Sequence, residues 1–158
     1  MRMRTLALLV LTSVIASCAQ QSASTGQAAP PPSNAVAPQQ FVLPPEIAGA
    51  TWQWVSLTTP GEEIKSSAPD RYTIRLEADG HVAIQADCNR GVGTFSVDAD
   101  RQINFGPIAL TRMMCPPGSQ SDRYVQELGR VSRYMLKDGE LLLEVTADSG
   151  TLRFRKQP

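Results

Sequence analysis

The sequence is poor in residues that build common catalytic centres, with one histidine and three cysteines among 158 residues. It contains none of the patterns Gly-x-Ser-x-Gly, Gly-x-Gly-x-x-Gly, Gly-x-x-x-x-Gly-Lys or Cys-x-x-Cys. These absences exclude the usual signatures of a serine nucleophile, dinucleotide binding, nucleotide binding and dithiol redox chemistry. The sequence therefore predicts no catalytic residue, no cofactor and no enzymatic activity.

Metal ligands are also scarce. The single histidine, His81, follows a hairpin signal at residues 79–80. Zinc sites rarely use one imidazole without further ligands at defined positions, so we interpret His81 as a solvated side chain. The Asp-Ala-Asp run at residues 98–100 lacks the further ligands and the glycine of a calcium loop, and we interpret it as a polar hairpin tip. No metal site is predicted.

No charge of either sign predominates, since 15 Lys and Arg residues balance 15 Asp and Glu residues. Nucleic-acid-binding domains usually carry a clustered excess of basic residues along one face. A nucleic-acid partner is therefore not expected.

Charged residues are almost absent from the first 45 positions, where only Arg2 and Arg4 occur. These arginines precede an apolar run over residues 6–15 and then small residues, which is the layout of a secretory signal peptide. As a helix the run spans about 15 Å, half of the roughly 30 Å hydrocarbon core of a bilayer. The run is therefore too short for a permanent transmembrane helix, and we predict a signal peptide over residues 1–17.

The end of this segment, Ile15-Ala16-Ser17-Cys18, resembles the lipobox of bacterial lipoproteins. The resemblance implies lipid attachment to Cys18, cleavage before it and acylation of the new N-terminus, and two or more acyl chains make membrane attachment stable. Ala19 stands where an aspartate would retain a lipoprotein in the inner membrane, which favours the outer membrane of a diderm bacterium. We therefore expect a protein of the cell envelope with its domain in the periplasm. The alternative is a soluble secreted protein cleaved nearby, for instance after Ala19.

Residues 18–45 are rich in Gln, Ser, Ala and Pro, with three consecutive prolines at 30–32. Such a composition cannot bury enough apolar surface to offset the entropy cost of ordering the chain. We predict a disordered, lipid-anchored tether over residues 18–45, which would reach roughly 30 Å as a flexible coil. The remaining residues 46–158 suffice for one domain with a modest core.

Residues 46–158 contain short alternating runs separated by turn residues, a pattern typical of a β protein. Alternating apolar and polar residues predict strands at 71–77 and 82–86, joined by a two-residue Asp-Gly turn. Trp52 and Trp54 would share one face of an earlier strand. Further strands are expected at residues 94–97, 102–105, 140–146 and 151–155. Without long parallel crossovers, the sequence predicts an α+β fold: a curved, mainly antiparallel sheet of about seven to eight strands with one short helix packed on it.

The segment from Ser119 to Met135 supports two interpretations. Apolar residues at 124, 128, 131 and 135 fall at helical spacing and would extend one helix. Alternatively, the helix begins at a Ser119 or Ser121 cap and ends at about residue 128 with Gly129 as a left-handed cap, and a strand starts near Val131. We favour the second, because the Asp-Gly turn at residues 138–139 needs a strand on each side.

Two cysteines remain if Cys18 is acylated. Cys88 and Cys115 would face an oxidising compartment after export and form an even pair. A bridge between them would close a loop of about 27 residues and stabilise the fold by roughly 3–4 kcal/mol in the chain-entropy model. The alternative is a reactive thiol, for which neither cysteine has a neighbouring histidine. We predict the disulfide.

The residues around these cysteines form two recognisable motifs. Residues 87–95 read Asp-Cys-Asn-Arg-Gly-Val-Gly-Thr-Phe, and residues 108–116 place a threonine, Thr111, and two methionines before the second cysteine. Both motifs resemble those of the META domain family, which includes heat-shock lipoproteins of the HslJ type, and the resemblance covers residues 46–158. Many members have Gly where this chain has Asp87, so we expect the turn there to differ locally.

The first motif suits a tight turn fixed by the disulfide. Asn89, Gly91 and Gly93 suit a backbone that enters left-handed conformations after a strand, and Asn89 can also hydrogen-bond nearby amides. Arg90 would pair with a carboxylate or contact a ligand.

The family resemblance implies a non-enzymatic envelope lipoprotein whose domain is a scaffold or interaction module for an unknown envelope protein, with a role in envelope stress or tolerance of toxic compounds. Two alternatives remain. A curved sheet under a helix can enclose an apolar pocket for a small hydrophobic ligand or lipid. A hydrolase would need clustered carboxylates in a cleft, and the sequence has no pair of carboxylates at a spacing that indicates such a site.

Overall fold

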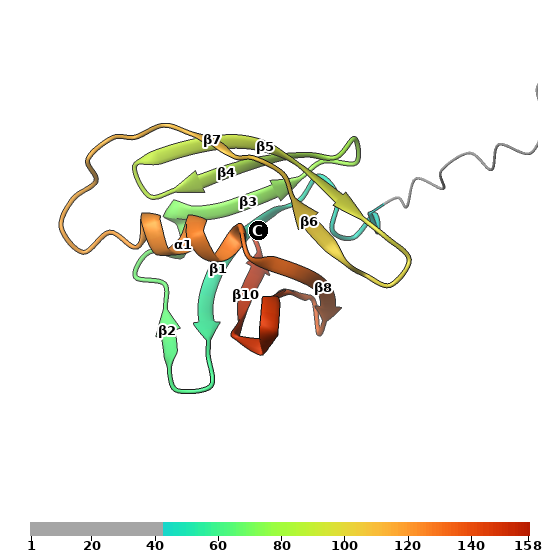
Figure 1. Ribbon diagram of the computed structural model, residues 1–158. Coiled ribbons are helices and arrows are strands. Elements are labelled where there is room, and N and C mark those ends of the chain that lie inside the picture. The colour runs from blue at the N-terminus through green and yellow to red at the C-terminus, as the bar shows by residue number, and fades with distance from the viewer. Residues whose placement is uncertain (1–42) are drawn as a thin grey trace, which may run out of the picture. The chain divides into compact units, whose positions relative to one another are not determined.

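The computed structural model describes residues 43–158, which form a strongly curved antiparallel sheet and one α-helix (Figure 1). The predicted signal peptide, Cys18 and nearly all of the predicted tether lie outside the described residues. The helix α1 spans Ser121–Leu128, and two short 3-10 helices span Pro69–Arg71 and Thr146–Asp148. The strands are β1 (Thr51–Thr58), β2 (Glu63–Lys65), β3 (Tyr72–Leu76), β4 (His81–Ala86), β5 (Asn89–Val97), β6 (Ile103–Phe105), β7 (Ala109–Leu110), β8 (Val131–Lys137), β9 (Glu140–Val145) and β10 (Gly150–Lys156).

The strands run in the order β6-β5-β4-β3-β1-β10-β9-β8, with β2 paired to β1 and β7 paired to β5. The two ends of this sheet meet, because Gln102 and Arg133 form a β-bridge and the Tyr134 N–H donates to the Arg101 carbonyl at 3.0 Å. The sheet is therefore nearly a closed barrel. The structure confirms the predicted fold class, and β2 and β7 are the short strands that the sequence pattern did not predict.

The predicted Asp-Gly hairpins are present, but their turns differ. Asp138 and Gly139 have φ angles of 53° and 78°, as a turn with two left-handed residues requires. In the β3–β4 turn only Gly80 is left-handed, with a φ of 86°, and the Glu77 N–H donates to the His81 carbonyl at 2.8 Å. That loop therefore has three residues rather than two, a common hairpin form that places Gly at the left-handed position.

The segment around residue 130 follows the favoured interpretation, with α1 ending at Leu128 and β8 starting at Val131. Two predictions about its caps are wrong. Gly129 is not left-handed but has a φ of −68°, because the chain continues through a tight right-handed turn directly into β8. The N-cap is Gln120 rather than a serine, and the Gln120 side chain makes no capping hydrogen bond; the Ser119 hydroxyl accepts from the Ser121 N–H at 3.3 Å.

Tertiary contacts explain this start of the helix. The Gln120 N–H donates to the Tyr72 hydroxyl at 2.8 Å, and its side-chain amide donates to the Lys65 carbonyl and accepts from the Ser67 N–H, each at 3.0 Å. Contacts to the segment 65–72 thus fix the first turn of α1. A sequence pattern centred on serine caps could not predict them.

Large side chains fill the barrel. Trp54, Tyr72, Tyr124 and Phe154 are fully buried, and the rings of neighbouring members lie 5.3 to 6.3 Å apart between centroids. Helix α1 contributes Tyr124 and Leu128 to this core, so its apolar side closes over the inside of the sheet. Within residues 43–158, no helix is long and apolar enough to cross a membrane.

Candidate functional site

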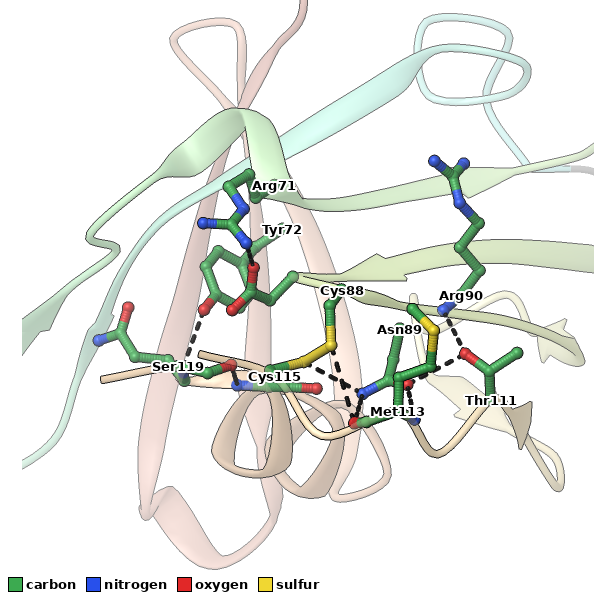
Figure 2. The surroundings of a disulfide bond; sticks show 12 residues. Arg71, Tyr72, Cys88, Asn89, Arg90, Thr111, Met113, Cys115 and Ser119 are labelled. Carbon is green, nitrogen blue, oxygen red and sulfur yellow. Dashed lines mark hydrogen bonds and ion pairs between the residues drawn. A yellow bond between two sulfur atoms is a disulfide. The ribbon is translucent and has the colours of Figure 1, made fainter. Parts of the chain in front are cut away.

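The candidate site is centred on the two cysteines of the folded domain. Cys88 lies between β4 and β5, and Cys115 lies in the segment between β7 and α1. The structure contains the predicted disulfide between them, with Cα atoms 5.5 Å apart (Figure 2). The bond therefore ties the β4–β5 turn to the segment 111–115, which we call the pinned loop.

Asn89 holds the pinned loop through its side chain. Its Oδ1 accepts from the Met113 N–H at 2.7 Å, and its Nδ2 donates to the Met113 carbonyl at 3.2 Å (Figure 2). The Nδ2 group also lies 3.3 Å from the Cys115 sulfur. Asn89 is only 5% exposed, so the amide is almost fully used within the protein. The prediction that Asn89 bonds nearby amides agrees with this geometry, although the amide belongs to a residue 24 positions away.

Thr111 adds a second set of contacts to Asn89 and its neighbour. Its hydroxyl donates to Asn89 Oδ1 and accepts from the Arg90 N–H, both at 3.0 Å. The Thr111 N–H donates to the Arg90 carbonyl at 2.9 Å. The two sequence motifs are therefore the two sides of one hydrogen-bonded unit, which fixes the start of β5 against the pinned loop.

The predicted left-handed conformations at Asn89, Gly91 and Gly93 are wrong, because all three residues lie in β5 and none has a positive φ. The glycines are needed for space. A Cβ on Gly91 would lie 2.8 Å from Leu110 Cδ1, and one on Gly93 would lie 3.1 Å from the Pro107 carbonyl oxygen. Their missing side chains let the segment 107–110 lie directly against β5.

The left-handed position of the β4–β5 turn is Asp87, with a φ of 61°. Glycine, the residue that the family resemblance implies for this position, tolerates that conformation without strain. The Asp87 N–H donates to the Arg71 carbonyl at 2.7 Å, and its buried carboxylate pairs with the Arg71 guanidinium (Figure 2). The glycine that the family resemblance implies at residue 87 was the only indication in the sequence of a left-handed conformation there. The ion pair between Asp87 and Arg71 was not predicted.

Exposed apolar side chains surround the hydrogen-bonded unit. Met114 is 99% exposed, Met113 59% and Val92 64%. Arg90 has no ion-pair partner among residues 43–158. It lines an open hollow of about 450 Å³ together with Val92 and Leu110. The predicted carboxylate partner of Arg90 is therefore not seen in this part of the chain.

His81 lies away from this unit, at the β3–β4 turn. Its Nδ1 lies 3.1 Å from Asp79 Oδ1, and both side chains are about two-thirds exposed. The pKa of Asp79 is lowered mainly by the hydrogen bond from the His81 backbone N–H and, to a smaller extent, by the hydrogen bond from the His81 side chain. Among residues 43–158, no group of three His, Cys, Asp or Glu side chains could hold a metal ion.

We predict that Asn89→Ala lowers the free energy of unfolding by about 2 kcal/mol, because it leaves the Met113 N–H and carbonyl without their partners. The matched variant Asn89→Asp keeps the acceptor oxygen but cannot donate to the Met113 carbonyl and sets a buried carboxylate oxygen against it, so its loss should be at least as large. Urea unfolding measures both values, and hydrogen exchange at the Met113 amide reports the loop directly. An unchanged exchange rate in Asn89→Ala would contradict this role.

Comparison with known proteins identifies the fold. Residues 45–158 match the META domain family. The structure is similar to the NMR structure of a protein from Burkholderia xenovorans, with 24% identity, a TM-score of 0.60 and coverage of 82% of this chain and 97% of that chain. It is also similar to the crystal structure of a DUF4847 family protein from Bacteroides vulgatus, with 18% identity, a TM-score of 0.52 and coverage of 71% and 96%.

No curated protein sequence matches this chain. At these identities the two structural similarities concern the fold alone. The family match includes both sequence motifs, the disulfide between them and almost every described residue. The chain therefore belongs to the META domain family.

Proposed function

We propose that this META-domain protein is a non-catalytic interaction module of the bacterial cell envelope. A lipid on Cys18 would anchor it to the outer membrane, with the domain in the periplasm and a protein of the envelope as its partner. The signal-peptide layout of residues 1–17 supports export, and the Cys88–Cys115 disulfide is typical of an oxidising compartment. The family resemblance further suggests a role in envelope stress or in tolerance of toxic compounds.

One observation carries the interaction role: the motif residues hold a loop that exposes two methionines, Met113 and Met114, next to the exposed Arg112. The polar groups of Asn89 and Thr111 bind the protein's own backbone and each other. A catalytic acid or base must instead reach a proton of the substrate. The loop that these groups hold presents Met113 and Met114 to solvent, and flexible methionine side chains are common at binding surfaces because they adapt to the partner.

The neighbouring strands extend this apolar surface. Val92 on β5 and Ala109 on β7 are exposed, and both line the hollow beside Arg90. The filled barrel interior supports the outer surface, rather than an internal pocket, as the binding region. The second candidate function is binding of a small amphiphilic ligand or lipid in this open hollow, which is favoured by its apolar walls and by the cationic Arg90 at its edge.

Photocrosslinking in intact cells tests the proposal. A photoreactive amino acid replaces Arg112, which is exposed within the pinned loop. This replacement leaves both methionines in place. The matched control replaces Ala99, which is exposed in the β5–β6 turn at the opposite end of the domain (Figure 1). We expect a discrete protein adduct from position 112 and none from position 99. Equal adducts from both positions would contradict the proposal, and a lipid adduct from position 112 would favour the second candidate.

The anchor is tested separately by Cys18→Ser. We expect the wild-type protein to fractionate with the outer membrane and to carry a lipid that metabolic labelling with a fatty acid detects. The variant should lose the label and leave the outer-membrane fraction. An unlabelled wild-type protein in the soluble fraction would contradict the lipid anchor and would leave the crosslinking result unaffected.

A further inference from the structure

The methionines of this protein fall into two environments. Met114 and Met113 are 99% and 59% exposed in the pinned loop, whereas Met135 is half-buried in β8. After removal of the predicted signal peptide, these three are the only methionines of the chain. Oxidation of a thioether depends on its access to the oxidant. Met113 and Met114 are therefore open to modification, and Met135 is a matched internal control.

The pinned loop is held by contacts that use no methionine side chain. Asn89 binds the N–H and the carbonyl of Met113, and the disulfide holds Cys115 (Figure 2). Thr111 is fixed through its hydroxyl and backbone N–H. A chemical change at either thioether leaves all of these contacts in place. It alters what the loop presents to a partner but not how the loop is attached.

We propose that Met113 and Met114 are an oxidant-sensitive modification site that switches off the interaction surface while the domain stays folded. The oxidant class is a hypohalous acid or a peroxide. This inference rests on the proposed function, because the loss of binding requires that the partner contacts the pinned loop.

The chemistry is a two-electron oxygen transfer. With hypochlorous acid, each thioether sulfur gains a bond to oxygen and loses two electrons, and the oxidant is reduced to chloride with release of a proton. With a peroxide, the O–O bond breaks and the oxidant leaves as water or an alcohol. The sulfoxide is polar, so its burial against an apolar partner removes it from water without a new hydrogen bond, which is unfavourable. Methionine sulfoxide reductases can restore the thioether.

The first experiment treats the full exported protein with substoichiometric hypochlorous acid and follows each methionine by peptide mass spectrometry. We expect sulfoxide at Met113 and Met114 to form several-fold faster than at Met135, with no change in melting temperature at the point where both are oxidised. The double variant Met113→Leu/Met114→Leu should keep the same melting temperature and take up oxygen only at Met135. Equal oxidation rates at all three methionines, or a fall in melting temperature, would overturn the proposal.

The second experiment repeats the crosslinking from position 112 after this oxidation. We expect the adduct yield to fall roughly tenfold, the loss expected for one buried and unpaired polar group. The leucine double variant has no thioether at these positions, so its adduct yield should be the same before and after oxidation, whatever its starting value. An undiminished adduct after complete oxidation would overturn the switch and leave the proposed function intact. If the reduced protein gave no adduct, the proposed function would fail and the switch would fail with it, whereas the oxidation rates would still decide whether the site is selective.

Discussion

Replacing Cys88 and Cys115 together with alanine is expected to lower the free energy of unfolding by about 3.5 kcal/mol. The two cysteines are 27 positions apart, and their bond restricts the unfolded chain over that whole loop. The closed segment contains β5, β6 and β7, so the bond limits the freedom of nearly a third of the strands before they pair. Urea unfolding of the wild-type protein and the variant under oxidising conditions measures the difference.

Reduction provides the control for this prediction. A reductant should bring the wild-type protein to the unfolding midpoint of the double variant and leave the variant unchanged. Equal midpoints for the oxidised wild-type protein and the variant would show that the bond contributes nothing to stability. Because Asn89 and the disulfide hold the same loop, we also expect the losses from Asn89→Ala and from removal of the disulfide to be non-additive.

Features with local causes were predictable from the sequence. The turn at Asp138 and Gly139 follows from the tolerance of both residues for a positive φ. It also decided between a long helix and the short α1 followed by β8, because the turn needs a strand on each side. The alternating patterns of β3, β4, β9 and β10 likewise lie within single segments of the chain.

The functions of Gly91 and Gly93 could not be predicted, because a glycine has two uses that a sequence does not distinguish. It tolerates a positive φ, and it leaves space for a neighbouring backbone. Here space is what matters, since Leu110 and the Pro107 carbonyl occupy the positions that side chains would need. Those neighbours are 14 or more residues away, and no local pattern shows that β7 returns to β5.

The ion pair between Arg71 and Asp87 likewise depends on residues that are far apart in the sequence. The carboxylate lies at a left-handed residue directly before the disulfide, and its partner Arg71 ends the 3-10 helix directly before β3, the strand that pairs with β4. Only the register of two strands brings them together. The family resemblance could therefore indicate that residue 87 departs from the implied glycine, but not what its side chain would bind.

Tyr124 lies in α1 and belongs to the core. Because residues 116–120 join the pinned loop to α1, the packing of Tyr124 also fixes the C-terminal side of that loop. The Tyr124 ring is fully buried, with centroids 5.3 Å from Trp54, 5.6 Å from Tyr72 and 6.3 Å from Phe154. Tyr124→Ala is expected to lower the free energy of unfolding by about 3–5 kcal/mol, since it removes those contacts and leaves a cavity. A loosened α1 should also raise hydrogen exchange in residues 116–120.

The matched variant Tyr124→Phe keeps the ring and removes only the hydroxyl. That hydroxyl has no hydrogen-bond partner among the described residues, and burial raises the pKa of Tyr124 well above its ordinary value. Loss of an unpaired buried polar atom should leave the stability unchanged or raise it by about 1 kcal/mol. Urea unfolding of both variants separates the two contributions. If Tyr124→Phe were instead as destabilising as a lost hydrogen bond, the hydroxyl would have a hydrogen-bond partner in solution.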